Sequence, residues 1–522
     1  MPRDASFSES YRLHTGIGLV VWVALGVLVF DWLLVRAAWF DRPGENTMPA
    51  AANVFVARRV QEGGPLYDDW RVRPHVVAYY GPLLYLPVGL IGRWTGADVH
   101  GLFMIGRWIS LLATLGTAGL IVAVLRVGRA VPPVIALGSA MVFLAAYDVF
   151  WRHDISFRPD APTWFLTMLG LYLVVRRDRG GALYGSVLVF LLAFLYKQSC
   201  VAGPVAVGLW LILTGRRREA IGYGALAVGS FVGVTILLNA ATDGRYLLNT
   251  VYALKGNTDF GNVVSLIPGF AGAVVVPLVV SAYALVVESS PRRWDVVAVL
   301  FVVSLVVSAA GTWRSGSGHY YYALALPPAC VVCGRQLARW WPPRRVERPV
   351  ETVLMVALSL AAVRYVPEAG LRLTEIPVRW KEFSQRHQSH RLLADFFTRL
   401  TGYLNSLPGP VLSQYDEMGL YCPRSIMIDT FTFSSMADAG VFDDGSLIEE
   451  IRQGKIEAIV ISPQTRTVYQ STYTFSRRWR EAMGERYRRV DVPGLEWAEI
   501  YRPVDRAAAP SAHGAAGIPP RP

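Results

Sequence analysis

Residues 41–94 have the sequence DRPGENTMPAAANVFVARRVQEGGPLYDDWRVRPHVVAYYGPLLYLPVGLIGRW. The interpretation of the rest of the chain depends on this stretch. This polar stretch follows the first apolar segment and ends in an aromatic run interrupted by Gly and Pro. Its carboxylates are Asp41, Glu45, Glu62, Asp68 and Asp69. A polar loop of this length, so early in a hydrophobic chain, is typical of an active-site loop.

The composition predicts a protein that is mostly embedded in a membrane. Of the 522 residues 53% are hydrophobic and only 17% are charged, whereas soluble domains carry about 25% charged residues. The net charge is +12, but the basic residues form short clusters between apolar runs. Cytoplasmic loops of membrane proteins have this pattern, whereas nucleic-acid-binding faces do not.

About eleven apolar stretches approach the length of roughly 17 to 25 residues that a membrane-spanning helix needs. They are 16–38, 103–125, 132–150, 161–175, 182–196, 201–213, 221–240, 266–287, 296–310, 320–337 and 350–365. The first has no clean cleavage site, so we expect a retained helix instead of a signal peptide. The sequence therefore predicts an α-helical polytopic membrane protein with about 11 transmembrane helices.

The arginine clusters decide how the ambiguous run 79–94 is interpreted. If the N-terminus is cytoplasmic and this run does not cross, five clusters fall on the cytoplasmic side, as the positive-inside rule requires. They are Arg126/Arg129, Arg176/Arg177/Arg179, Arg216/Arg217/Arg218, Arg292/Arg293 and Arg335/Arg339/Arg344/Arg345/Arg348. We therefore predict that 79–94 is a juxtamembrane helix in the outer interface.

The composition changes after the last apolar stretch. Residues 367–503 combine a charged helical segment, short apolar runs and an amphipathic helix candidate at 447–452, which predicts a small extracytoplasmic α/β domain. Residues 504–522 are predicted to be a disordered tail. Residues 1–366 would then form the membrane-embedded domain.

Three carboxylates of the first loop are candidates for chemistry. Glu45, in PGENT, suits a general base if it is partly buried, and the alternative is a solvated loop carboxylate. Asp68 and Asp69 follow GGPLY, where they could bind a divalent cation or stabilise a turn. The metal requirement stays open.

Cationic candidates flank the other predicted outer loops. Arg158 and Asp160, in ISFRPDAP, precede an apolar helix, where they could form an anion site or Asp160 could cap the helix. Lys197 separates two short apolar runs and suits a phosphate partner, although a lone snorkelling lysine is the alternative. The third group, in TWRSGSGHYYYALALPP, is Arg314, His319 and Tyr320. Together they favour a substrate with a membrane-embedded tail, an anionic phosphate and a neutral group to be moved.

In this order the features resemble the C-type glycosyltransferase (GT-C) superfamily, in particular its bacterial aminoarabinose and protein mannosyl transferases. The matching features are Glu45 in PGEN, GPLYDD at 64–69, YYGPLLYLP, RPD at 158–160, KQ at 197–198 and HY at 319–320. The resemblance covers about residues 16–337. Many relatives carry two carboxylates at the position of Glu45, whose neighbours here are Gly44 and Asn46.

The resemblance implies a GT-C fold and an inverting sugar transfer from a polyprenyl-phosphate donor to a lipid, glycan or protein acceptor. It implies a location in the bacterial inner membrane, with catalysis on the extracytoplasmic side and no nucleic-acid partner. Glu45 or Asp69 would be catalytic. The phosphate- and lipid-binding residues would be Arg158, Lys197, Arg314, His319 and Tyr320, supported by Asp41, Asp68, Asp160 and Tyr67. A polyprenyl-linked glycan ligase and a lipid-glycan flippase or transporter remain alternatives.

Overall fold

The computed structural model describes residues 4–127, 131–150, 152–255, 258, 260–287, 294–314, 317–340, 349–462 and 475–507. The chain divides into two compact units. The helical unit comprises Met1–Tyr67, Ala78–Thr250 and Asn257–Ser389, and the α/β unit comprises Asp68–Val77, Val251–Gly256 and His390–Pro522. The predicted boundary after residue 366 lies inside helix α15 (Pro349–Ser406).

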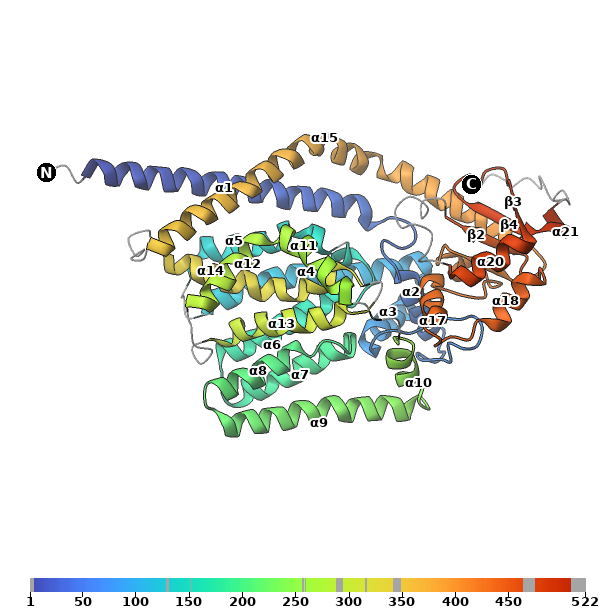
Figure 1. The fold of residues 1–522 in the computed structure, drawn as a ribbon, viewed down its shortest axis with the longest axis horizontal. Helices are drawn as coiled ribbons and strands as arrows, with labels where there is room; N and C mark the ends of the chain where they lie inside the picture. The colour runs from blue at the N-terminus through green and yellow to red at the C-terminus, as the bar shows by residue number, and fades with distance from the viewer. Residues whose placement is uncertain are drawn as a thin grey trace. The chain divides into compact units, whose positions relative to one another are not determined.

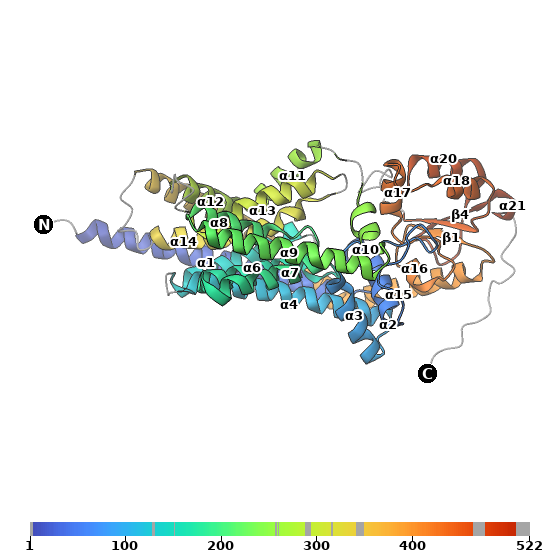
Figure 2. The same ribbon diagram turned by 90° about the horizontal axis from the view of Figure 1, so that it is seen from below.

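The helical unit is built around a bundle of apolar helices (Figure 1). Besides α15 and the three-residue α10 (Arg245–Leu247), its helices are α1 (Asp4–Phe40), α2 (Ala50–Gln61), α3 (Pro82–Thr95), α4 (Val99–Arg126), α5 (Pro133–Ala145), α6 (Asp160–Arg176), α7 (Gly180–Tyr196), α8 (Ala202–Leu213), α9 (Arg217–Ala241), α11 (Phe260–Ala273), α12 (Val275–Val287), α13 (Val296–Thr312) and α14 (Leu326–Trp340). Helices α8 and α9 lie side by side in both Figure 1 and Figure 2. Their apolar side chains share one large core that also includes Trp164 and Phe190.

Helices α1 and α15 meet near Ala369 of α15. Leu25 and Leu28 of α1 share a small core with Ala369 of α15. In the same region Arg372 Nε lies 3.9 Å from the buried carboxylate of Asp31. The N-terminal helix is therefore held by both apolar and charged contacts.

Within the part of the chain that the structure describes, three helices are long and apolar enough to cross a membrane: Val20–Phe40, Val99–Arg126 and Arg217–Ala241. The bent pair α11 and α12 adds a fourth if it counts as one span. Four further apolar helices have 12 to 17 residues, because Gly, Pro and polar loops interrupt the apolar stretches. The predicted number of about eleven spans stays a prediction.

Helix α3, within the ambiguous run 79–94, has 14 residues. At about 1.5 Å per residue it extends roughly 21 Å, less than the hydrocarbon core of a bilayer, which is about 30 Å thick. That length fits the predicted juxtamembrane helix. Of the arginines used to predict the topology, Arg129, Arg292, Arg293, Arg344, Arg345 and Arg348 lie outside the described residues.

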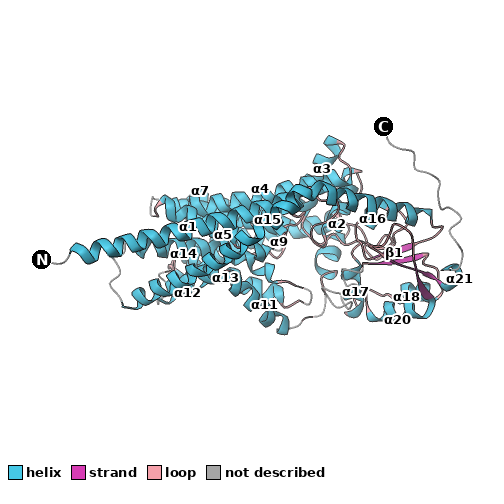
Figure 3. Cartoon of the chain, turned by 90° about the horizontal axis from the view of Figure 1, so that it is seen from above, coloured by secondary structure: helices cyan, strands magenta, loops and turns pink. Residues whose placement is uncertain are grey.

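The α/β unit contains a four-stranded sheet, seen in magenta in Figure 3. Its strands are β1 (Val411–Ser413), β2 (Ala458–Ile461), β3 (Tyr487–Val490) and β4 (Glu499–Pro503), in the order β1-β2-β4-β3. β1 and β2 are parallel, and the other pairs are antiparallel. Its helices are α16 (Met418–Tyr421), α17 (Thr430–Asp438), α18 (Gly445–Arg452), α20 (Arg477–Arg486) and α21 (Val504–Ala507). The mixed α/β character predicted for this region is confirmed, and α18 is the predicted amphipathic helix.

A short piece of the first loop completes the α/β unit. His75 donates its backbone N–H to Ile426, 3.0 Å away, and accepts from the backbone N–H of Ile428 at 2.9 Å. The His75 ring packs against Phe433 and Phe442. At the other end of the chain, 504–507 form α21, and the rest of the predicted tail lies outside the described residues.

Candidate functional site

A single buried carboxylate organises the cationic candidates of the helical unit. Asp160 is the first residue of α6, and Lys197 directly follows α7. Lys197 Nζ donates to Asp160 Oδ1 at 2.8 Å, and Arg158 Nε donates to Oδ2 at 3.1 Å. The His153 ring adds Nδ1 at 3.4 Å from Oδ2. Buried charges are stable only when they are paired. These contacts therefore hold the four side chains in fixed positions relative to one another.

The network carries a net positive charge. Burial alone would raise the pKa of Asp160, but Lys197 and Arg158 hold that pKa well below its usual value, so the carboxylate is ionised. Burial and the nearby Arg158 lower the pKa of His153, which is therefore neutral. Two cations facing one carboxylate leave one positive charge, which favours an anionic ligand.

Aromatic rings cover the network on one side. Tyr320 contacts the His153 ring edge-on, with 4.1 Å between the ring centroids, and the Arg158 guanidinium lies 5.4 Å from the Tyr320 ring. Lys197 Nζ lies 4.7 Å from the ring of Tyr321. A cavity of about 50 Å³ opens here, lined by Asp160, Thr163, Trp164, Lys197, Ser199, Cys200, Val307, Ser308, Gly311, Tyr320, Tyr321 and Leu324. Both polar and apolar side chains therefore face this space beside the Asp160 network.

The loop that carries Glu45 is fixed from two directions. Glu45 Oε2 accepts the backbone N–H of Ala51 at 2.9 Å, at the start of α2. The buried Arg107 of α4 donates to the carbonyl oxygens of residues 40, 42 and 44. Arg158 donates to the carbonyl oxygen of Met48 in the same loop. Arg158 therefore connects the half-buried Glu45 loop to the Asp160 network.

Tyr80 and Gly81 join the juxtamembrane segment to this network. Arg158 Nη2 lies 3.5 Å from the Tyr80 hydroxyl, and the Tyr67 hydroxyl donates to the Tyr80 carbonyl at 2.8 Å. Gly81 donates its N–H to the last carbonyl of α7, that of Tyr196, at 3.2 Å. A Cβ at Gly81 would lie 2.0 Å from the backbone oxygen of Leu195. Glycine is therefore required for the backbone to approach Lys197 so closely.

Gly81→Ala is expected to lower the midpoint of thermal unfolding by several degrees, because the new methyl group collides with backbone and overpacking costs about 1–3 kcal/mol or more. Gly119→Ala in α4 is the matched control, since nothing lies within 4 Å of its added Cβ. The measurement is thermal unfolding of both variants in the same detergent. Equal midpoints for the two variants would contradict the close approach at Gly81.

The remaining predicted residues lie elsewhere or make other contacts. The carbonyl oxygen of Arg314 accepts from Asn262 and Ser317, so it is the backbone of Arg314 that makes these hydrogen bonds. His319 is close enough to lower the pKa of His153. Asp41 lies 3.9 Å from both Arg386 and His387 of α15.

Asp68 and Asp69 belong to the α/β unit, whereas the Asp160 network belongs to the helical unit. Asp69 accepts two hydrogen bonds from the Arg71 guanidinium, at 2.8 and 2.7 Å. Asp68 Oδ1 accepts the N–H of Asp69, which is a turn contact. Among the described residues no group of three or more His, Cys, Asp or Glu side chains could hold a metal ion.

Three residues of the site were not predicted: Tyr80, Arg107 and His153. Arg107 interrupts the apolar stretch 103–125, and a charge inside a predicted span is a candidate by default. His153 lies seven residues before Asp160 in WRHDISFRPD, where an ionisable group borders an apolar stretch. Tyr80 has no comparable signal, because tyrosines are common at membrane interfaces.

Comparisons with known proteins identify the fold. No family model matches the chain, and no curated protein matches it. Among solved structures, ArnT from Cupriavidus metallidurans in the apo state matches with a TM-score of 0.55 and 13% identity, over 96% of this chain and 100% of that one. The same protein bound to undecaprenyl phosphate matches with 0.54 and 14% identity, over 94% and 98%. AglB, an archaeal oligosaccharyltransferase from Archaeoglobus fulgidus in complex with an inhibitory peptide and a dolichol-phosphate, matches with 0.50 and 11% identity, over 91% and 74%. The chain therefore has the GT-C fold.

Proposed function

We propose that this protein is a membrane glycosyltransferase that moves a sugar from a polyprenyl-phosphate donor to an acceptor on the extracytoplasmic side. The observation that carries the proposal is the buried Asp160 network, whose Arg158 and Lys197 leave a net positive charge beside the Glu45 loop. The fold adds support, because ArnT was crystallised with undecaprenyl phosphate and AglB with a dolichol-phosphate.

In the proposed reaction the acceptor hydroxyl attacks the anomeric carbon of the donor sugar. Glu45 takes the proton of that hydroxyl as general base. The bond between the anomeric carbon and the phosphate oxygen breaks, and its electron pair leaves on the lipid phosphate. Arg158 and Lys197 stabilise the negative charge that develops on this oxygen. A single displacement of this kind inverts the anomeric configuration.

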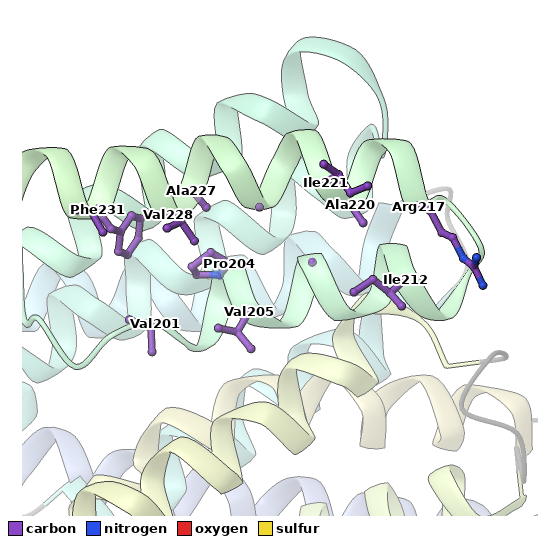
Figure 4. Close-up of a pocket in the computed structure, with 13 residues that line it drawn as sticks. Val201, Pro204, Val205, Ile212, Arg217, Ala220, Ile221, Ala227, Val228 and Phe231 are labelled. Atoms are coloured by element: carbon purple, nitrogen blue, oxygen red, sulfur yellow. The ribbon is translucent and has the colours of Figure 1, made fainter.

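A groove between α8 and α9 suits the lipid chain of such a donor (Figure 4). It encloses about 800 Å³, and almost all of its lining is apolar. Val201 lies at one end, next to Cys200 of the site cavity, and Arg217 lies at the other end. From Arg217 to Val232 the groove follows α9 for roughly 22 Å at about 1.5 Å per residue. An isoprenoid chain whose phosphate binds at Lys197 could lie along it.

Filling this groove is expected to weaken donor binding without changing the chemistry. Nothing lies within 4 Å of a Cβ added at Gly208 or Gly224, so leucine at either position would project into the groove. We expect Gly208→Leu and Gly224→Leu to raise KM for a long-chain donor about tenfold, equivalent to about 1.4 kcal/mol of lost burial. The kcat value and the KM for a water-soluble short-chain donor should be unchanged.

Gly185→Leu in α7 is the matched control for the groove variants. Its Cβ also meets nothing within 4 Å, but Gly185 does not line the groove. The measurement is initial rates against donor concentration for both chain lengths. An equal KM increase for the short-chain donor, or an effect of Gly185→Leu as large as that of Gly208→Leu, would show that the groove does not hold the chain.

The proposed activity is tested with the full-length protein in liposomes. The donors are undecaprenyl-phosphate sugars labelled in the sugar, and the acceptors are a bacterial envelope fraction. Label is expected to move from the lipid extract to the acceptor fraction while an equal amount of undecaprenyl phosphate is released. Movement of intact labelled lipid across the bilayer, without bond cleavage, would support a flippase instead. Transfer of a preassembled glycan in preference to a single sugar would support a ligase.

A further inference from the structure

A second cationic cluster lies at the end of α1, around Trp39. The Arg152 guanidinium lies 3.5 Å from the centroid of the Trp39 ring, and that of Arg42 lies 4.7 Å from it. Cation–π attraction accounts for each contact alone. The two guanidinium groups therefore lie close together beside one indole ring.

The surrounding charges do not neutralise Arg152. Arg36 is paired with Asp154 at 2.7 Å, and Arg379 lies 3.4 Å from both Glu375 and Glu382. Among the described residues, no Asp or Glu forms an ion pair with Arg152. Burial, followed by the charges of Arg36, Arg42 and Arg379, lowers the pKa of Arg152 to about 10, and Glu382 acts in the opposite direction. An anion beside Arg152 would therefore be bound strongly.

The backbone of Arg152 is unusual as well. Its φ is +66°, and only Asp243 and Asp429 share a positive φ among the non-glycine residues that the structure describes. Such a conformation is strained for a long side chain, and strained residues gather at functional sites. The conformation places the guanidinium on Trp39 while the Arg152 carbonyl accepts from the Ser156 hydroxyl at 2.7 Å. These two contacts therefore fix the loop between Arg152 and Arg158.

We propose that Trp39, Arg42 and Arg152 form a second anion site, which binds a phosphate ester other than the donor phosphate. Arg42 Nη1 also lies 3.4 Å from the carbonyl oxygen of Glu45, so the site borders the proposed general base. A phosphate carried by the acceptor and bound here would bring a nearby hydroxyl to Glu45. This role rests on the proposed function, whereas the anion site itself does not.

Two sources could supply the phosphate: a phosphorylated glycan, or the headgroup of a membrane phospholipid. The guanidinium groups would bind either one bidentately. The end of α1, the loop at 152–160 and the beginning of the extracytoplasmic tail are all predicted to lie on the outer side of the membrane. Both sources are compatible with that location, so the experiment must separate them.

The test uses full-length protein in nanodiscs of phosphatidylcholine, saturated with undecaprenyl phosphate to fill the donor site. Glucose 1-phosphate and dihexanoyl phosphatidylglycerol are titrated separately by calorimetry, with glucose as the uncharged control. Binding of glucose 1-phosphate alone supports a phosphorylated glycan, and binding of phosphatidylglycerol alone supports a lipid headgroup. Binding of both supports the phosphate site without preference.

Three variants tie the binding to Arg152. Arg152→Asn removes the charge but tolerates a positive φ, so it should fold as well as the wild type and bind the phosphate probe at least tenfold more weakly. Arg152→Lys keeps the charge but loses the bidentate guanidinium and its stacking on Trp39, so it should bind the phosphate probe more weakly than the wild type and more tightly than Arg152→Asn. Arg93→Ala, at an exposed arginine of α3, is the matched control and should bind normally.

Unchanged binding in Arg152→Asn, or no saturable binding of either phosphate probe by the wild type, would overturn the second anion site. Failure of the proposed function has a different signature. In that case a separate titration of the unloaded protein with undecaprenyl phosphate would show no binding, whereas the difference between Arg152→Asn and the wild type could still be measured in its absence.

Discussion

Lys197→Ala is expected to lower kcat for sugar transfer by a factor of about 10² to 10³, the usual effect of removing one group that stabilises developing negative charge. Lys197 Nζ lies 2.8 Å from Asp160 and belongs to the wall of the site cavity. Without it the net positive charge of the network disappears, and only Arg158 faces the leaving phosphate. Release of undecaprenyl phosphate in single-turnover experiments measures the effect.

The alternative is that Lys197 only neutralises Asp160. A double variant, Lys197→Met with Asp160→Asn, separates the two roles, because it removes both charges of the buried pair together. It should unfold at a higher temperature than Lys197→Ala and still be inactive. Recovery of activity in the double variant would mean that Lys197 is purely structural. Lys381→Ala, at an exposed position of α15, serves as the control.

Glu45→Gln is expected to lower kcat by about 10² to 10⁴, the range for loss of a general base, while donor binding is retained. Glutamine has nearly the same shape, and its side-chain oxygen can still accept the N–H of Ala51 that Glu45 Oε2 accepts at 2.9 Å. The loop should therefore keep its conformation. Binding of undecaprenyl phosphate by calorimetry and transfer rates, measured on one preparation, separate the two effects.

Glu62→Gln is the control for the base assignment, because Glu62 is exposed and pairs with Arg58 of α2 at 2.8 Å. Asp41→Asn and Asp69→Asn test the other carboxylates of the first loop. If Glu45→Gln retains half of the wild-type kcat and Asp41→Asn or Asp69→Asn abolishes transfer, the base is not Glu45. Loss of activity in both Glu45→Gln and Asp41→Asn would indicate a shared role.

The sequence identifies candidate residues more readily than it identifies their partners. Arg158, Asp160 and Lys197 were candidates because each lies at the end of an apolar stretch, where a charge is costly. The helix-cap alternative for Asp160 is wrong: Pro159 occupies the N-cap position, and the Asp160 carboxylate faces Lys197, 37 residues away. Patterns along the chain describe neighbours three or four residues apart, so they do not predict a pair of this separation.

The division into units was equally hard to predict. The sequence placed Asp69 in the same loop as Glu45, but the structure assigns it to the α/β unit, because the segment around His75 forms backbone hydrogen bonds with 426–428. Composition does not predict which distant segment will form backbone hydrogen bonds with the residues around His75, because an extended segment from any part of the chain could do so. The helical class follows from composition and from the length of the apolar stretches, and the α/β character of the tail follows from its short apolar runs and amphipathic segment; all of these depend only on local sequence.

The contact between α1 and Asp154 has a consequence for how the protein is made. Trp32 and Arg36 both donate to Asp154 Oδ2, at 2.8 and 2.7 Å, although Asp154 follows Arg36 by 118 residues. At a synthesis rate of about 5 to 20 residues per second, α1 would wait roughly 6 to 24 s before its partner leaves the ribosome. During biogenesis the guanidinium of Arg36 must therefore be solvated by lipid headgroups or by the insertion machinery, and the first helix takes its final place only after the loop that carries Asp154 has been translated.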